Sequence, residues 1–153
     1  MGGQKKLFIR LEFVWWLITA IVAMTILLPI CIEVENYPFF WDNLLFIVAF
    51  ITFTRLIFFL RYSLIADKKK IKAALFFISI FIVFMLVQKV NQFQIDIDEN
   101  GIDAMLGNSI SDNRQGLMNY IRQEMLFFGV GGAISGILLP FRLMKSIWQD
   151  FNK

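Results

Sequence analysis

The chain has 153 residues, of which 58% are hydrophobic, and its mean hydropathy is +0.66. Soluble domains are about 45–50% apolar, so this composition excludes an ordinary globular protein and favours a single membrane domain. The absence of histidine and the single cysteine, Cys31, exclude His-based catalysis, an internal disulfide and a thiolate metal cluster. We therefore expect no enzyme activity and no cofactor. The net charge of +3 fits a membrane surface better than nucleic acid.

Residues 13–32 form the first predicted transmembrane helix. These twenty residues carry no charge and follow a short basic tail, residues 1–12. About twenty apolar residues suffice to cross a hydrocarbon core of about 30 Å. A cleaved signal peptide is the alternative, because basic residues precede the apolar run. The run is longer than a usual signal core and no A-x-A-like site follows it, so we expect a retained span.

Residues 43–64 and 71–90 are predicted as the second and third transmembrane helices. The turn before the second, residues 33–42, is acidic and rich in aromatic residues, which is typical of a membrane interface. The turn between the two helices is basic. Its lysines are candidate contacts for anionic lipid headgroups, namely Lys68, Lys69, Lys70 and Lys72.

Arg55 lies well inside the second apolar run. A charge at a helix centre costs about 2.5–3.5 kcal/mol on insertion scales, so an intramembrane charge is by default a functional hypothesis. The structural alternative is that Arg55 extends its guanidinium toward the interface near Arg61, about 9 Å away along the helix. Because no acidic residue lies in the middle of any predicted span, we expect no internal ion pair and predict that a partner subunit supplies the countercharge.

Residues 91–119 are predicted as one sizeable external loop. At its start, residues 92–98 (QFQIDID) alternate apolar and polar side chains, which is a strand-like pattern. With no second strand evident, we expect an extended segment or an edge that pairs with a partner. Asp96, Asp98 and Asn100 match the first half of a calcium-binding EF-hand loop. Gly107 occupies the position that requires Glu, which favours a plain acidic turn.

The charge distribution predicts the orientation. Eleven of the fifteen Lys and Arg residues fall in the N-terminal tail, the turn before residue 73 and the C-terminal segment, with three acidic residues. The opposite side carries three basic and nine acidic residues. Since cytoplasmic loops are enriched in Lys and Arg, we expect both termini in the cytoplasm. The localisation we predict is a bacterial inner membrane.

The fourth predicted helix covers residues 120–145 and has a face of small residues. The seventeen residues from Met125 to Phe141 carry no charge, and Gly129, Gly132, Ala133 and Gly136 share one helical face. Each glycine costs a helix about 1 kcal/mol relative to alanine. Such a face allows another helix backbone to approach closely, so we predict a helix-packing surface that closes this bundle or docks a neighbour.

Glu124 marks the outer end of this apolar run. A carboxylate there is either a solvated helix end or a contact for a partner or a proton. Complementarity to the helix dipole explains it poorly, because we expect the helix to begin about a dozen residues earlier, near Ser111 or Asp112.

The segment RQEMLFFGVGGAISGILLPFRLMKSIW, within residues 120–148, resembles small membrane proteins that accompany ExbB/ExbD-type proton-channel motors. Those motors energise outer-membrane transport through TonB. The resemblance implies an accessory subunit whose partners contain the proton-carrying carboxylate. It carries over no functional residue, since the segment holds no catalytic motif.

The sequence as a whole predicts an all-α integral membrane protein with four transmembrane helices. The expected function is a non-catalytic subunit that contacts membrane lipids and other integral membrane subunits. A small homo-oligomeric channel or transporter, in which Arg55 and Glu124 line a path, is the alternative.

Overall fold

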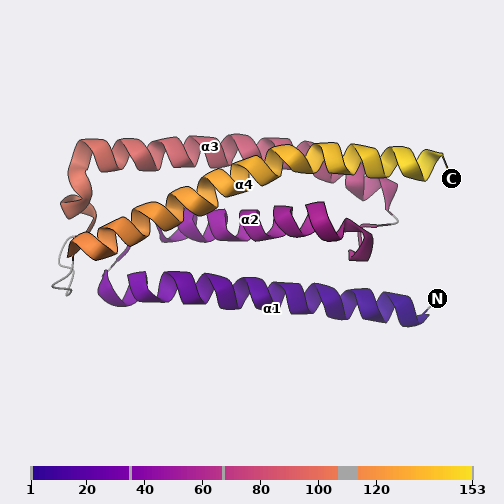
Figure 1. Ribbon diagram of the computed structural model, residues 1–153, viewed down its shortest axis with the longest axis horizontal. Helices are drawn as coiled ribbons and strands as arrows, with labels where there is room; N and C mark the ends of the chain where they lie inside the picture. The colour runs from indigo at the N-terminus through magenta and orange to yellow at the C-terminus, as the bar shows by residue number, and fades with distance from the viewer. Residues whose placement is uncertain (1, 35, 67, 107–113, 153) are drawn as a thin grey trace.

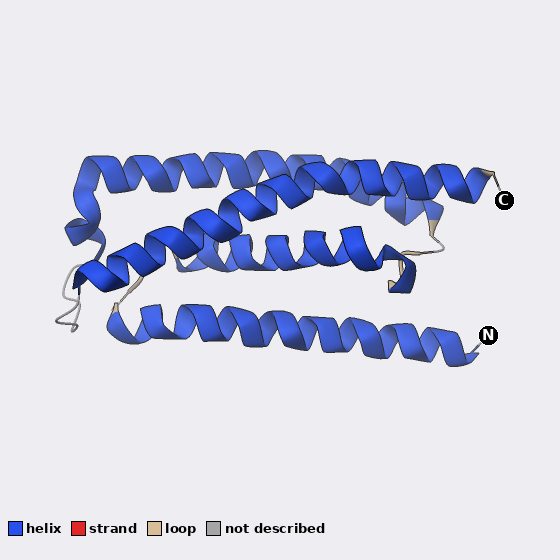
Figure 2. Ribbon diagram, in the orientation of Figure 1, coloured by secondary structure: helices blue, strands red, loops and turns tan. Residues whose placement is uncertain are grey.

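A computed structural model of the chain describes residues 2–34, 36–66, 68–106 and 114–152. The elements are α1 (Gly2–Glu33), α2 (Phe40–Phe59), the short 3-10 helix η1 (Leu60–Tyr62), α3 (Lys69–Leu106) and α4 (Arg114–Phe151). Within the described residues all regular structure is helical (Figure 2). Each of the four long helices contains a window long and apolar enough to cross a membrane. The all-α, four-helix prediction is therefore confirmed at this level.

The four helices run side by side, and α4 crosses the bundle diagonally from α2 toward α3 (Figure 1). Helices α2, α3 and α4 share the main core, whose most buried members include Phe46, Leu86, Phe93, Met125 and Leu139. Helix α1 packs chiefly on α2, through a smaller cluster centred on Ala23, Leu27 and Ile47. Both chain termini lie at the same end of the bundle (Figure 1).

The small residues of α4 lie inside the bundle. A Cβ built on Gly129 would come within 2.5 Å of a Val90 methyl carbon on α3. A Cβ on Gly136 would lie 2.9 Å from the Phe53 ring of α2 and closer still to Val83 of α3. Around Gly132 there is more room, and the nearest atom is a Leu86 methyl carbon at 3.4 Å. Ala133 is buried on the same helix. This face therefore meets α2 and α3 of its own chain.

The prediction of an extended segment at residues 92–98 is wrong, because α3 continues as a helix to Leu106. Phe93 is buried and Ile97 is partly buried, whereas Ile95 is exposed. Val90, Phe93 and Ile97 follow a helical spacing, so one helical face of this polar stretch packs on the core. The half EF-hand at Asp96, Asp98 and Asn100 is likewise helical and forms no calcium loop. The predicted helix start at Ser111 or Asp112 lies outside the described residues.

Candidate functional site

A buried polar cluster joins α2 and α4 in the half of the bundle away from the termini. Asn43 of α2 has an exposed fraction of 0% and Glu124 of α4 one of 8%. Asn43 Nδ2 donates a hydrogen bond to Glu124 Oε1. Asn43 is placed by the first turns of α2, and Glu124 lies one turn before Phe128, which packs against the core. The fold thus brings together two polar groups that are 81 residues apart in sequence.

Two acceptors in this cluster lack a hydrogen-bond partner among the described residues. They are the second oxygen of each group, Asn43 Oδ1 and Glu124 Oε2, and both atoms are buried. A buried polar atom without a partner costs about 1–3 kcal/mol, so such atoms are rare and call for a physical reason. Within the part of the chain that the structure describes, no ion pair includes Glu124, and the Asn43 amide is the hydrogen-bond partner of its carboxyl group.

Further polar groups border the cluster. The Tyr37 hydroxyl, in the turn before α2, donates to Met125 Sδ over 3.1 Å. Burial raises the pKa of this hydroxyl above its ordinary value. Asp42, next to Asn43, forms an ion pair of 3.1 Å with Lys89 of α3. These contacts fix the start of α2 against α3 and α4.

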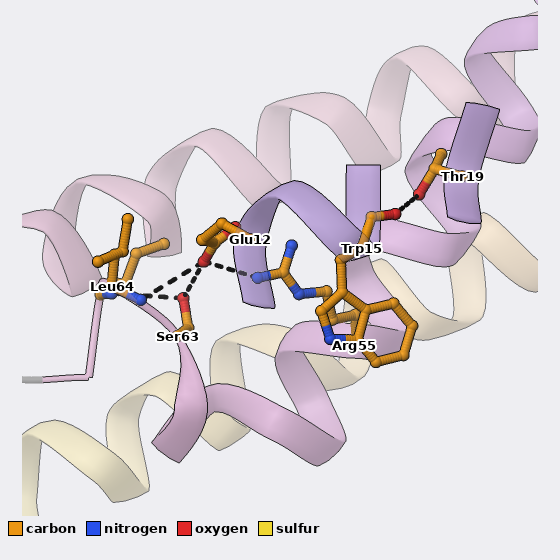
Figure 3. Close-up of polar contacts among 7 residues, drawn as sticks. Glu12, Trp15, Thr19, Arg55, Ser63 and Leu64 are labelled. Carbon is orange, nitrogen blue, oxygen red and sulfur yellow. Dashed lines mark hydrogen bonds and ion pairs between the residues drawn. The ribbon is translucent and has the colours of Figure 1, made fainter. Parts of the chain in front are cut away.

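Arg55 has its countercharge within the chain. Its Nη2 lies 2.6 Å from Glu12 Oε1 of α1, and its Cζ lies 5.6 Å from the centroid of the Trp15 ring (Figure 3). The turn after α2 completes the site, since Ser63 Oγ (3.1 Å) and the Leu64 amide (3.4 Å) donate to the same Glu12 oxygen. The side chains of Arg55 and Glu12 are 10% and 20% exposed, so the pair is largely shielded.

The prediction that no internal ion pair is possible is therefore wrong. It depended on residues 1–12 forming a tail outside the first span, whereas α1 is helical from Gly2. Glu12 immediately precedes the apolar run 13–32, and the antiparallel packing of α1 and α2 brings it level with Arg55 (Figure 3). The signal in the sequence was one acid beside the first apolar run and one base inside the second.

The four lysines of the basic turn differ in position. Lys68, Lys69 and Lys70 are exposed, as contact with lipid headgroups requires. Lys72 is instead buried, with an exposed fraction of 1%, and its Nζ donates to Ser146 Oγ of α4 over 2.9 Å. Lys72 thus joins α3 to α4 in this structure.

Arg142 makes a contact that the sequence did not indicate. Its Nε donates to the backbone carbonyl oxygen of Ile57 over 3.1 Å. Ile57 lies in the last turn of α2, where carbonyl groups lose their helical partners because the chain tightens into η1. Arg142 therefore caps α2 from a neighbouring helix.

Comparisons with protein-family models, with curated proteins and with solved structures gave no significant match.

Proposed function

We propose that the chain is a non-catalytic subunit of a larger membrane assembly, docked through α1. The observation that carries this proposal is the one-sided packing of α1. A stripe of large apolar side chains along this helix is exposed, comprising Phe13, Leu17, Ile21, Met24, Leu28 and Ile32. These residues recur every three or four positions, so they share one face of the helix.

Two features that predicted a partner make their contacts inside the chain, which leaves the exposed face of α1 as the candidate docking surface. Arg55 is paired with Glu12, and the glycines of α4 face α2 and α3. A second transmembrane helix laid along the α1 stripe would bury apolar side chains without disturbing either contact. The stripe is the docking surface we propose, with a membrane helix of another subunit as the occupant.

The specific assembly we propose is an ExbB/ExbD-type motor in a bacterial inner membrane. Two things support it: the resemblance of residues 120–148 and a charge distribution that favours cytoplasmic termini. The common position of both termini at one end of the bundle fits an even number of spans (Figure 1). Fusions of a reporter to each terminus test the orientation, and a periplasmic signal from either would contradict it.

Site-specific photocrosslinking tests the docking surface. A photoreactive residue at Met24, on the stripe, is compared with one at Phe81 on α3, a matched control because the two side chains are 67% and 65% exposed. Foreign membrane subunits crosslinked from Met24 and not from Phe81 support the proposal. Equal crosslinking at both positions, or crosslinks to lipid alone at Met24, would refute it.

A small homo-oligomeric channel or transporter is the second candidate. One observation favours it, namely the buried carboxyl group of Glu124 with an oxygen that has no partner among the described residues. Ionisable groups within membrane helices commonly mark ion or proton pathways. Native mass measurement in mild detergent separates the two candidates: multiples of this chain alone favour the second, and stoichiometric foreign subunits favour the first.

A further inference from the structure

The Asn43–Glu124 pair lacks one donor hydrogen for its two remaining acceptor oxygens. Asn43 Nδ2 supplies a donor to Glu124 Oε1, while the remaining oxygens, Oδ1 and Oε2, are both acceptors when the carboxyl group is ionised. An amide and a carboxyl group that share one hydrogen bond can form a second one beside it, because each group is planar and carries its two polar atoms on one carbon. In the ionised state this arrangement sets lone pair against lone pair.

We propose that Glu124 and Asn43 form a proton-binding site, in which Glu124 Oε2 carries a hydrogen and donates it to Asn43 Oδ1. One proton taken from water satisfies both orphaned acceptors and closes a ring of two hydrogen bonds between α2 and α4. The site then carries no charge, which its burial favours, since an isolated buried carboxylate is far more costly than a neutral hydrogen-bonded acid. Loss of the proton leaves an uncompensated charge between the two helices.

Among the described residues, no cation forms an ion pair with Glu124. Lys89 of α3, a cation on a facing element, is engaged in an ion pair with Asp42 of α2. Tyr37, before α2, and Tyr120, on α4, also interact electrostatically with Glu124, and a phenol is neutral at pH 7. Proton binding at this site therefore ties the packing of α2 on α4 to the protonation state of one side chain. This inference holds whether or not α1 docks a partner.

Infrared spectroscopy of the full chain in phospholipid nanodiscs tests the proposal. At pH 7 we expect the C=O stretching band of a protonated carboxyl group, present in the wild type and lost in Glu124→Gln. The control is Glu12→Gln, which removes a carboxylate held by an arginine and should leave the band in place. A wild-type spectrum without the band, or a band that survives Glu124→Gln, would overturn the proposal.

Thermal unfolding provides a second readout. Glutamine has the shape and hydrogen-bonding pattern of the neutral acid, so Glu124→Gln should keep or raise the Tm at pH 7. Glu12→Gln should lower the Tm, because it leaves Arg55 without its countercharge. A Tm for Glu124→Gln as low as that of Glu124→Ala, or a failure of Glu124→Gln to fold, would contradict the proposed acid–amide pair.

Discussion

Replacing Gly136 with alanine is expected to destabilise the bundle, whereas the same replacement at Gly132 is expected to be tolerated. The added Cβ at Gly136 would overlap the Val83 side chain and lie 2.9 Å from the Phe53 ring. Phe53 is buried, and the branched side chain of Val83 has little rotameric freedom in a helix, so neither neighbour can yield easily. At Gly132 the nearest atom stands at 3.4 Å, an ordinary contact distance.

The expected magnitude follows from two opposing effects. Alanine stabilises a helix by up to about 1 kcal/mol relative to glycine, and this gain applies at both positions. Inserting a methyl group into a filled core costs about 1–3 kcal/mol. Gly136→Ala should therefore lower the free energy of unfolding by about 0–2 kcal/mol, and Gly132→Ala should raise it by up to about 1 kcal/mol. The difference between the two variants, about 1–3 kcal/mol, does not depend on the helix-propensity value.

Reversible unfolding of the purified chain in mixed micelles, followed by tryptophan fluorescence, measures this difference. Gly129→Ala serves as a second test, because its Cβ would lie 2.5 Å from a Val90 methyl carbon, and it should resemble Gly136→Ala. Equal stability of all three variants would show that the glycine face does not pack internally. Should Gly132→Ala prove the most destabilising, the reasoning from distances would be refuted.

The remaining predictions concern polar contacts. Arg55→Leu and Glu12→Leu should each destabilise the chain, while the double variant loses less than the sum, with a coupling of about 0.5–3 kcal/mol in a double-mutant cycle; additive losses would argue against the ion pair. Arg142→Met should cost about 0.5–1.5 kcal/mol through its lost hydrogen bond to α2, measured by the same unfolding assay, and no change would contradict the cap. The raised pKa of Tyr37 means that the folded state holds the phenolic proton more tightly, so this stability is present below the ordinary pKa of 10.0 and is lost as pH rises above it. Tyr37→Phe should therefore flatten the alkaline loss of stability, and an alkaline profile identical to that of the wild type would refute the assignment.

The number and type of the helices could be predicted because the hydrophobic signal is local. Residues 13–32 and 71–90 are long apolar runs, and their length alone indicates membrane-spanning helices. The extent of the helices could not be predicted in the same way, because α3 continues through polar sequence to Leu106. There the alternation of Phe93, Ile95 and Ile97 masked the helical series Val90, Phe93 and Ile97, and packing on the core decides between the two patterns.

The polar clusters depend on contacts between distant parts of the chain. Glu124 was identified as a candidate from its place beside an apolar run, but its partner Asn43 carries no local signal that sets it apart from other asparagines. Arg55 was identified by its depth in the second apolar run, and its partner was missed because Glu12 was assigned to the tail. A single charge inside an apolar run can be recognised from the sequence. Which opposite charge it pairs with depends on how neighbouring helices are aligned along the bundle axis, and this is known only from the structure.

The Glu12–Arg55 contact has a consequence for the biogenesis of the chain. Synthesis places α1 ahead of α2, so the carboxylate of Glu12 already exists when Arg55 emerges from the ribosome. An unpaired arginine at a helix centre adds about 2.5–3.5 kcal/mol to the free energy of membrane entry. Entry of α1 and α2 together as one hairpin lets the two charges neutralise each other on the way in. We therefore expect α1 and α2 to enter the membrane as one insertion unit, to which α3 and α4 are added.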